Sequence, residues 1–387
     1  MTGHIRKRGE RSWAILLDLP RGPDGKRRRK WHTVHGTKKD AQRKRNELLH
    51  EIESGAYCEP AKMTVERFLE RWLKHASSKV GDKTFERYSE IVHKNLIPAL
   101  GALNLPRLQP LHIEDFYIEM LESGRKNGNG GLSPQSVTHF HRVLRSALNQ
   151  AVKWQLLVRN PADAVEPPKV ERKEMKTLDA SRTAWLFMAA QGTRLYTPIV
   201  LESTLGIRRG EVFALRSADL SLTAAGAATI RRSLQETNVG LKFKTPKNGK
   251  ARRVSLLKLT IDALIQHREE QAKERALFGE DYQDNDLVFP LPDGSPWPPD
   301  SFSDQFRRFR DKCGLKIRYH DLRHSHATQL MEQGVHPKVV SERLGHSSVG
   351  ITLDLYSHVS PNLQDEAAQK LDVALQKELA KQRKTVS

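Results

Sequence analysis

Apolar side chains recur at three- and four-residue spacing through the middle of the chain, a pattern that predicts amphipathic helices. One apolar face runs from Val65 to Ala76 and a second from Phe85 to Leu96. A third helix is predicted from about His112 to Leu121. A fourth should begin at Ser133, a good capping residue followed by a proline, and run to about Trp154. The aromatic residues on these faces are expected to form a core rather than to stack on bases.

The beginning of the chain has the pattern of a small sheet followed by a helix. Strands are predicted at Gly3–Arg8, at Trp13–Leu19 and, after a Pro-Asp-Gly turn signal, at Lys26–Trp31. A helix should then start at Thr37, with Asp40 three residues on as a variant of the capping box.

The chain from Thr177 onward is predicted to be mostly helical, with one stretch of strand and turn. Strands are expected at Ala228–Arg232, Leu241–Lys244 and Arg252–Leu256, the last two joined as a hairpin by the turn Pro246–Lys250. An amphipathic helix is predicted from Asn362 to about Gln382. The sequence leaves open whether this tail folds back on its own chain or docks on a neighbouring one.

Two proline-containing seams divide these patterns, one at residues 53–62 and the other at residues 160–176. We therefore predict a multidomain α+β protein with three parts. Residues 1–60 would form a three-stranded sheet with a helix, residues 61–165 a four-helix domain, and residues 175–387 a mostly helical domain with a small β-sheet.

Composition points to a nucleic-acid partner. The 387 residues carry a formal net charge of +19 and give a pI near 9.9, so the field of the protein attracts polyanions. Mean hydropathy is −0.62 and no apolar run approaches the length of a membrane span, which favours a cytoplasmic protein. The two cysteines, Cys58 and Cys313, lie too far apart in sequence to indicate a disulfide framework or a cysteine zinc site.

Basic residues gather on the predicted sheet and on the polar faces of the helices. Residues 1–60 contain 15 Lys and Arg against 8 Asp and Glu, and a sheet of this size suits a major groove. A solvated basic appendage is the alternative. The predicted DNA contacts are Arg6, Lys26, Arg27, Arg28, Arg29 and Lys30 in the sheet, and Lys83, Arg87, Arg142 and Arg145 in the helices.

The candidate chemistry lies mainly near the carboxyl end. His320 and Arg323 precede His346, and Tyr356 follows ten residues later, with Arg208 upstream. Guanidinium groups can hold phosphate oxygens bidentately, imidazoles can exchange protons near neutral pH, and a phenol can attack phosphorus. These residue types therefore indicate a phosphate clamp with a nucleophile, which can cut and rejoin DNA.

A two-metal site is the other common solution for phosphodiester chemistry, and it needs carboxylates converging on cations about 4 Å apart. Asp321 and Asp354 stand beside basic residues rather than beside further acids. We therefore expect neither a metal nor another cofactor. His320 and His324, four residues apart on one helix face, are a weaker candidate for a zinc site.

Four motifs in this order resemble the tyrosine recombinase (phage integrase) family: Gly206–Glu211, His320–His324, Leu344–His346 and Tyr356. The helical segment is similar to the core-binding domain of that family, and the beginning of the chain to an arm-binding domain. The resemblance implies a site-specific DNA recombinase that integrates or excises a mobile element through a 3′-phosphotyrosyl intermediate. A type IB topoisomerase and a catalytically silent DNA-binding regulator are the alternatives.

The resemblance also implies roles for the site residues. Arg208 and Arg323 would bracket the scissile phosphate, with Glu211 as a residue that orients one of them. Tyr356 would be the nucleophile. Arg209 is expected to contact the DNA backbone or to be solvated.

Proton transfer falls to the remaining residues of the site. His320 is the candidate base, and His346 would donate a hydrogen bond to a phosphate oxygen. Lys247 would protonate the leaving oxygen, although Lys244 and Lys250 lie close enough in sequence to compete for that role. His326 is expected to be a packing group.

The partners implied are double-stranded DNA, at core and arm attachment sites, and three further copies of the chain in a tetramer. DNA-bending and directionality (excisionase) factors are compatible with this assembly. The family's tail helix packs on the next protomer.

Overall fold

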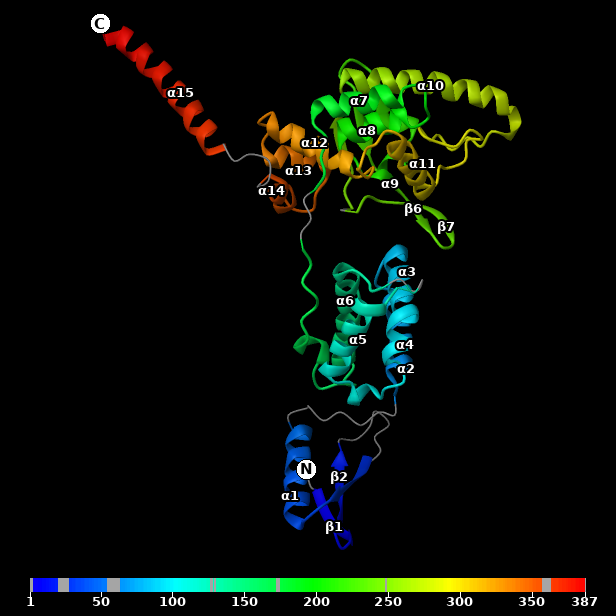
Figure 1. Cartoon of the computed structure of the whole chain (residues 1–387), viewed down its shortest axis with the longest axis vertical. Coiled ribbons are helices and arrows are strands. Elements are labelled where there is room, and N and C mark those ends of the chain that lie inside the picture. The colour runs from blue at the N-terminus through cyan, green and yellow to red at the C-terminus, as the bar shows by residue number, and fades with distance from the viewer. Residues whose placement is uncertain are drawn as a thin grey trace. The chain divides into compact units, whose positions relative to one another are not determined.

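A computed structural model describes residues 3–19, 28–53, 63–125, 128, 130–171, 175–247, 249–356 and 363–386 (Figure 1). The chain divides into two compact units, Met1–Arg172 and Lys173–Ser387. The sheet with its helix, the helical segment and the second unit each have a hydrophobic cluster of their own.

The first part is an antiparallel sheet in the order β1-β2-β3, made of β1 (Gly3–Gly9), β2 (Ser12–Leu19) and β3 (Arg28–His35), followed by helix α1 (Lys38–Glu53). Fully buried Ile15 and Leu17 of β2 pack against Leu48 of α1. The capping box is confirmed, because the Thr37 N–H donates to the Asp40 carboxylate at 2.9 Å and the Asp40 N–H donates to the Thr37 hydroxyl.

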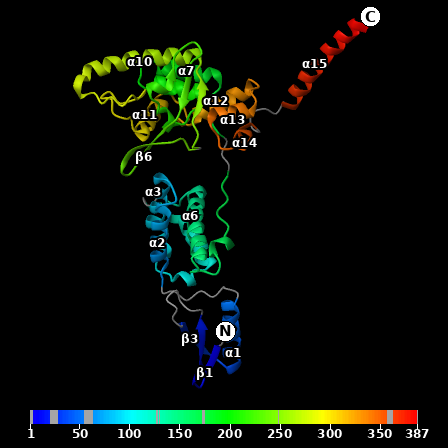
Figure 2. The same cartoon turned by 180° about the vertical axis from the view of Figure 1, so that it is seen from behind.

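The helical segment contains the four predicted helical stretches. They are α2 (Val65–Ser77), α3 (Asp82–Ile91) continued by a π-helical turn (Val92–Leu96) and α4 (Ile97–Leu100), α5 (Pro110–Ser123) and α6 (Pro134–Lys153). Short 3₁₀ turns stand at Leu105–Arg107 and Pro161–Ala164. Helix α2 packs against α6 (Figure 2), and Phe68 and Trp72 lie in the core between the helices, as predicted for the aromatic residues.

The second unit is mostly helical and is built around the buried helix α8. Its helices are α7 (Ala180–Ala190), α8 (Tyr196–Leu205), α9 (Arg209–Val212), α10 (Lys258–Phe278), α11 (Pro299–Lys312), α12 (Asp321–Glu332), α13 (Pro337–Leu344), α14 (Gly350–Tyr356) and α15 (Leu363–Val386), with 3₁₀ turns at Ser217–Asp219 and Gly279–Asp281. Helix α8 contacts α7, α10 and α12, and every residue from Thr197 to Leu205 is buried.

Five strands form two small sheets in this unit, and their pairing corrects one prediction. The strands are β4 (Leu220–Ser221), β5 (Ala227–Ile230), β6 (Ser233–Thr237), β7 (Gly240–Lys244) and β8 (Arg252–Ser255). Strands β4, β5 and β8 make one sheet, and β6 and β7 make the other. The predicted hairpin between β7 and β8 is therefore wrong. The unpredicted strand β6 pairs with β7 across a tight turn that places Gly240 at a φ of 115°, a value that favours glycine.

Two further expectations concern single features. Within the part of the chain that the structure describes, no helix is long and apolar enough to cross a membrane. Cys313 is a free, partly exposed thiol, and Cys58 lies outside the described residues.

Candidate active site

Two glycines end the helices that lead into the site. Gly206 ends α8 and Gly345 ends α13, both in the left-handed conformation, with φ of 64° and 68°. A β-carbon on Gly206 would stand 2.4 Å from Leu344, and one on Gly345 would stand 2.9 Å from the guanidinium of Arg252. The glycines of both motifs therefore permit the turns that present Arg208 and His346, each of which follows within two residues.

A buried carboxylate organises the arginines. Glu211 is 1% exposed and accepts hydrogen bonds from Arg208 Nη1 at 3.1 Å and from Arg252 Nη2 at 2.6 Å. Burial raises the pKa of Glu211, but the Arg252 hydrogen bond and the charges of Arg252 and Arg208 outweigh it and hold that pKa below its usual value. Glu211 is therefore ionised and hydrogen-bonded to Arg208, and its role of orienting that residue for catalysis stays a prediction.

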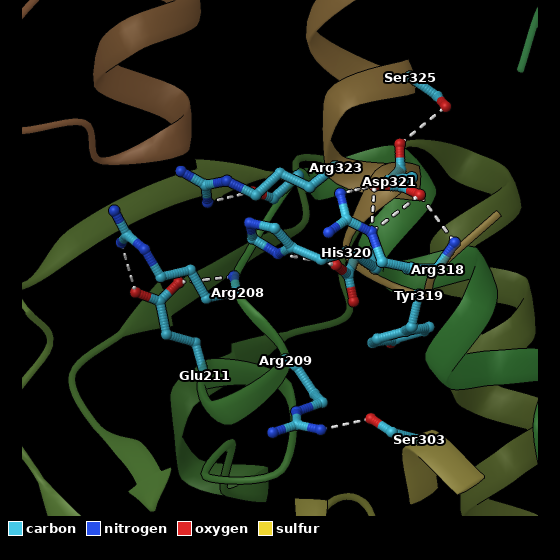
Figure 3. A network of polar contacts seen from close by, with 12 residues as sticks. Arg208, Arg209, Glu211, Ser303, Arg318, Tyr319, His320, Asp321, Arg323 and Ser325 are labelled. Atoms are coloured by element: carbon cyan, nitrogen blue, oxygen red, sulfur yellow. Dashed lines mark hydrogen bonds and ion pairs between the residues drawn. The ribbon is translucent and has the colours of Figure 1, made fainter. Parts of the chain in front are cut away.

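Arg208 and Arg323 meet from different elements (Figure 3). Arg208 caps the start of α9 and donates from Nη2 to the Gly345 carbonyl at 3.0 Å. Arg323, in α12, donates from Nη1 to the Gly206 carbonyl at 2.5 Å. Burial, followed by the charge of Arg208, lowers the pKa of Arg323 to about 9, so it remains largely protonated at neutral pH. Two neighbouring guanidinium cations repel each other in a partly buried site. An anion bound by both of them would relieve this repulsion.

Two imidazoles border these cations. His320 precedes α12 and lies beside Arg208 and Arg323 in Figure 3. Burial, His324 and Arg323 lower the pKa of His320 to about 4. Burial, Arg323 and Arg208 likewise lower the pKa of His346 to about 4. Both rings are therefore neutral near pH 7, and each can accept or donate one proton.

Helix α14 is tied to this group through His346. The Nδ1 atom of His346 lies 2.9 Å from the hydroxyl of buried Thr352, and α14 packs on α12 and α13. Tyr356 is the last residue of α14, one helical turn after Thr352. The Tyr356 side chain lies outside the described residues, and its role as nucleophile stays a prediction.

Lys247 lies in the connection between β7 and β8 and is exposed. Because these strands belong to different sheets, the connection is a loop between sheets rather than the predicted hairpin tip. The competing Lys244 and Lys250 flank this loop, and the choice among the three lysines stays a prediction.

The contacts of three residues near the site can be compared with what the sequence predicted for them. Arg209 was expected to contact DNA or solvent, but it donates to Asp300 at 2.8 Å and to Ser303, both on α11. His326 is a packing group as predicted, and its Nε2 accepts from Arg343 Nε at 3.0 Å. Arg252 was missed. Its signal was its place two residues before inward-facing Val254 in a strand, which puts an arginine on the core side of the sheet.

The zinc alternative does not gain support from the ring positions. His320 and His324 meet edge to face with centroids 5.2 Å apart. No group of three or more His, Cys, Asp or Glu side chains suited to a metal ion occurs in the described ranges. The Asp321 carboxylate accepts from Arg318 at 2.8 Å, in keeping with its place beside basic residues.

The predicted DNA contacts are only partly described. In the sheet, Arg6 is exposed, Arg29 pairs with Asp18 at 2.9 Å, and Lys30 is partly buried in β3. Lys26, Arg27 and the side chain of Arg28 lie outside the described residues. In the helices, Lys83, Arg87 and Arg145 pair with Glu86, Glu90 and Asp163, and exposed Arg142 joins Arg145 in lining a hollow of 620 Å³.

The fold and the cluster of guanidinium and imidazole groups suit a protein that transfers phosphoryl groups. The phage integrase family model matches residues 171–362, and the model of the phage integrase N-terminal SAM-like domain matches residues 64–121. The chain belongs to the phage integrase family of tyrosine recombinases.

Relatives and solved structures agree with this assignment. The chain is 29% identical to an integrase of Saccharopolyspora erythraea, over 93% of both chains, and 29% identical to the ICEBs1 integrase of Bacillus subtilis strain 168, over 74% of this chain and 77% of that one. The fold is similar to that of the Tn1549 transposon integrase in complex with a circular intermediate DNA, with a TM-score of 0.67 at 19% identity over 80% of this chain and 99% of that chain. It is also similar to the lambda integrase tetramer bound to a Holliday junction, with a TM-score of 0.57 at 18% identity over 91% and 94%.

Proposed function

We propose that this protein is a site-specific DNA recombinase that integrates or excises a mobile element through a covalent Tyr356–DNA intermediate. The observation that carries the proposal is that Arg208, Arg323, His320 and His346 lie close enough for both arginine charges to lower the pKa of both imidazoles. Relatives named as integrases along nearly the whole chain support the same conclusion.

In the proposed reaction, Arg208 and Arg323 hold the non-bridging oxygens and stabilise the charge that develops as phosphorus becomes five-coordinate. The Tyr356 oxygen forms a bond to phosphorus as the bond from phosphorus to the 5′ oxygen breaks. A neutral imidazole takes the phenol proton, and Lys247 gives a proton to the leaving oxygen. Between them, His320 and His346 supply one proton acceptor and one hydrogen-bond donor. Attack by a second 5′-hydroxyl reverses the steps, so bond energy is conserved.

We assign residues 1–60 to arm sites, residues 61–165 to the core site, and residues 175–387 to catalysis. The sheet bearing Arg6 and Arg29 and the helical hollow lined by Arg142 and Arg145 supply positive charge for the first two tasks. Because the proposed substrate is DNA, we assign the protein to the cytoplasm of a bacterial host, in association with the nucleoid.

The assembly that we propose is a tetramer on DNA, as in the lambda integrase structure bound to a Holliday junction. The apolar residues Leu371, Leu375 and Leu379 of α15 are each more than half exposed, which suits a tail that packs on a neighbouring protomer. DNA-bending and directionality factors would act on this complex.

A nicked suicide substrate tests the proposal, because loss of the short strand beside the cleavage site traps the covalent adduct. Wild-type protein should form an adduct in EDTA, and Tyr356→Phe should form none. Tyr282→Phe, which removes a hydroxyl bonded to Gln271 at 3.1 Å, is the matched control and should react normally.

Each remaining outcome has a distinct meaning. An unchanged adduct in Tyr356→Phe would refute the nucleophile. Recombinant product from two attachment sites separates a recombinase from a topoisomerase that reseals one duplex. Absence of any adduct from wild-type protein would favour a regulator that only binds DNA.

A further inference from the structure

Glu202 lies in the interior of α8, close to His320 of the proposed active site. It is 0% exposed in a helix whose other residues from Thr197 to Leu205 are also buried. Neither of its carboxyl oxygens has a hydrogen-bond partner among the residues that the structure describes. Burying an unpaired carboxyl destabilises a fold. A carboxyl kept in the interior despite this cost indicates a functional task.

The carboxyl faces an imidazole of the site. Glu202 Oε1 lies 3.7 Å from Nδ1 of His320, which is longer than a hydrogen bond. Since Nδ1 faces Glu202, Nε2 is the nitrogen left for the exposed half of the ring, whose side chain is 49% exposed. Glu202 therefore meets His320 at Nδ1 and leaves Nε2 available to a substrate.

Tyr319 is the other polar neighbour of Glu202. Its hydroxyl donates to the Pro198 carbonyl at 2.7 Å, and a phenol has one proton, so that hydroxyl has only lone pairs to offer the carboxyl. Burial is the largest effect and raises the pKa of Glu202 well above its usual value. The contact with Tyr319 and the charges of Arg323 and Arg209 act in the opposite direction without outweighing it. A neutral carboxyl thus faces a neutral imidazole, and the carboxyl has a proton that it can donate to Nδ1.

We propose, resting on the proposed function, that Glu202 is a positioning residue whose buried carboxyl donates to Nδ1 of His320 and fixes the imidazole as the tautomer protonated on Nε2. Closing the 3.7 Å separation by less than an ångström makes this hydrogen bond.

This assignment gives the two histidines different roles in the reaction. With its proton on Nε2, His320 donates to a non-bridging phosphate oxygen instead of accepting a proton there. His346, whose Nδ1 is engaged by Thr352, is then the ring whose Nε2 takes the phenol proton of Tyr356. The sequence suggested the reverse, with His320 as base and His346 as donor.

The test is a spectroscopic one on the full-length protein, labelled with ¹⁵N-histidine and free of DNA. Two-bond ¹H–¹⁵N correlations report which ring nitrogen carries the proton, and the His320 signals are identified by their loss in His320→Asn. His267, whose Nε2 lies 2.7 Å from the Val288 carbonyl, is an internal reference that no variant should change.

Wild-type protein and Glu202→Gln should both show His320 protonated on Nε2, because glutamine keeps a donor for Nδ1. Glu202→Met removes the donor and should give averaged signals of both tautomers. The rate of adduct formation on the suicide substrate should fall about 10- to 100-fold in Glu202→Met, a range found for lost partners of functional histidines, and should be largely kept in Glu202→Gln.

An Nδ1-protonated His320 in wild-type protein, or an unchanged tautomer in Glu202→Met, would overturn the assignment. A thermal unfolding midpoint at or above that of wild type establishes that the Met variant is folded, and the wild-type spectrum tests the idea even if that variant fails to fold. The proposed function fails separately, through an adduct that survives in Tyr356→Phe, because the spectra need neither DNA nor cleavage.

Discussion

In the helical segment, three of the four cations expected to touch DNA pair with carboxylates at the surface, whereas in the catalytic unit two arginines bind one buried carboxylate. Lys83, Arg87 and Arg145 form ion pairs of 3.7, 2.8 and 2.7 Å while remaining more than half exposed. In the site, Arg252 is 9% exposed and Glu211 1%. The same chemical pairing therefore occurs in two very different dielectric surroundings.

The difference teaches how each region can meet a phosphate. An exposed pair contributes about 0–1 kcal/mol, so its cation can exchange a carboxylate for DNA at little cost. A buried pair cannot rearrange without leaving a charge uncompensated. Glu211 accordingly holds Arg208 in place before substrate arrives, and this preorganisation is what a transition state for phosphoryl transfer requires.

Removing the buried carboxylate should give the largest effect. Glu211→Ala leaves Arg252 buried without its partner, and we expect the free energy of unfolding to fall by about 3–5 kcal/mol. Urea unfolding measures it. The control, Asp300→Ala, breaks the more exposed pair with Arg209 and should cost less than about 1 kcal/mol. Equal losses in the two variants would erase the distinction between buried and exposed pairs.

Replacing a buried arginine by lysine should come next. Arg323→Lys keeps a positive charge but loses the planar donors that reach the Gly206 carbonyl and a phosphate oxygen together. The rate of adduct formation should fall about 10²- to 10³-fold, as for other single donors to a transition state. Arg307→Lys, which alters an exposed pair with Asp304, should leave the rate unchanged. A rate in Arg323→Lys close to wild type would show that charge alone is sufficient.

Acid should destabilise the catalytic unit through three histidines whose pKa values are lowered in the folded protein. The pKa values of His320 and His346 fall from 6.5 to about 4, and that of buried His326 falls to about 3. Because the unfolded chain binds protons below pH 6.5 and the folded site does not, stability is full above that pH and is lost as pH falls towards 4. The thermal midpoint should decrease across this window, with a shallower slope in His326→Gln. A midpoint that rises on acidification would contradict the sign.

Exposed pairs should give the smallest effects. Arg145→Ala should weaken binding to core DNA, reduce the slope of log affinity against log salt by about one, and change stability by at most about 1 kcal/mol. Asp163→Ala removes the carboxylate that competes for Arg145, and should raise affinity slightly. Filter binding across a salt series measures both. Identical salt slopes in wild type and Arg145→Ala would remove Arg145 from the DNA contacts.

Local patterns in the sequence identified most of the elements. The spacing of Phe68 and Trp72 predicted α2, Ser133 with Pro134 predicted the start of α6, and Thr37 with Asp40 predicted the start of α1. These signals act within one or two turns of backbone, so the residues that produce them are neighbours in sequence. Pairing of strands is not local, and the partner of β7 was wrongly predicted for that reason.

The residues that support the site were harder to predict than the motifs. Arg252, Thr352 and Glu202 stand outside the familiar motifs, and each acts on a residue distant in sequence or on another element. Glu202 carried one signal, as the single acid in the otherwise uncharged helix α8. That signal did not identify the partner of Glu202, because the local sequence does not determine which side chain a buried carboxyl will face.

The sequence by itself determined which reactive groups are present, namely a basic chain with ordered motifs of arginine, histidine and tyrosine. It also determined the helices, whose boundaries are encoded by caps and apolar spacing. Only the tertiary structure decided which carboxylate orders Arg208, that Arg209 serves an internal ion pair, and which histidine nitrogen faces the buried Glu202. Ionisation explains the division. The charge of a side chain depends on its burial and on neighbours contributed by remote elements, and these exist only once the chain has folded.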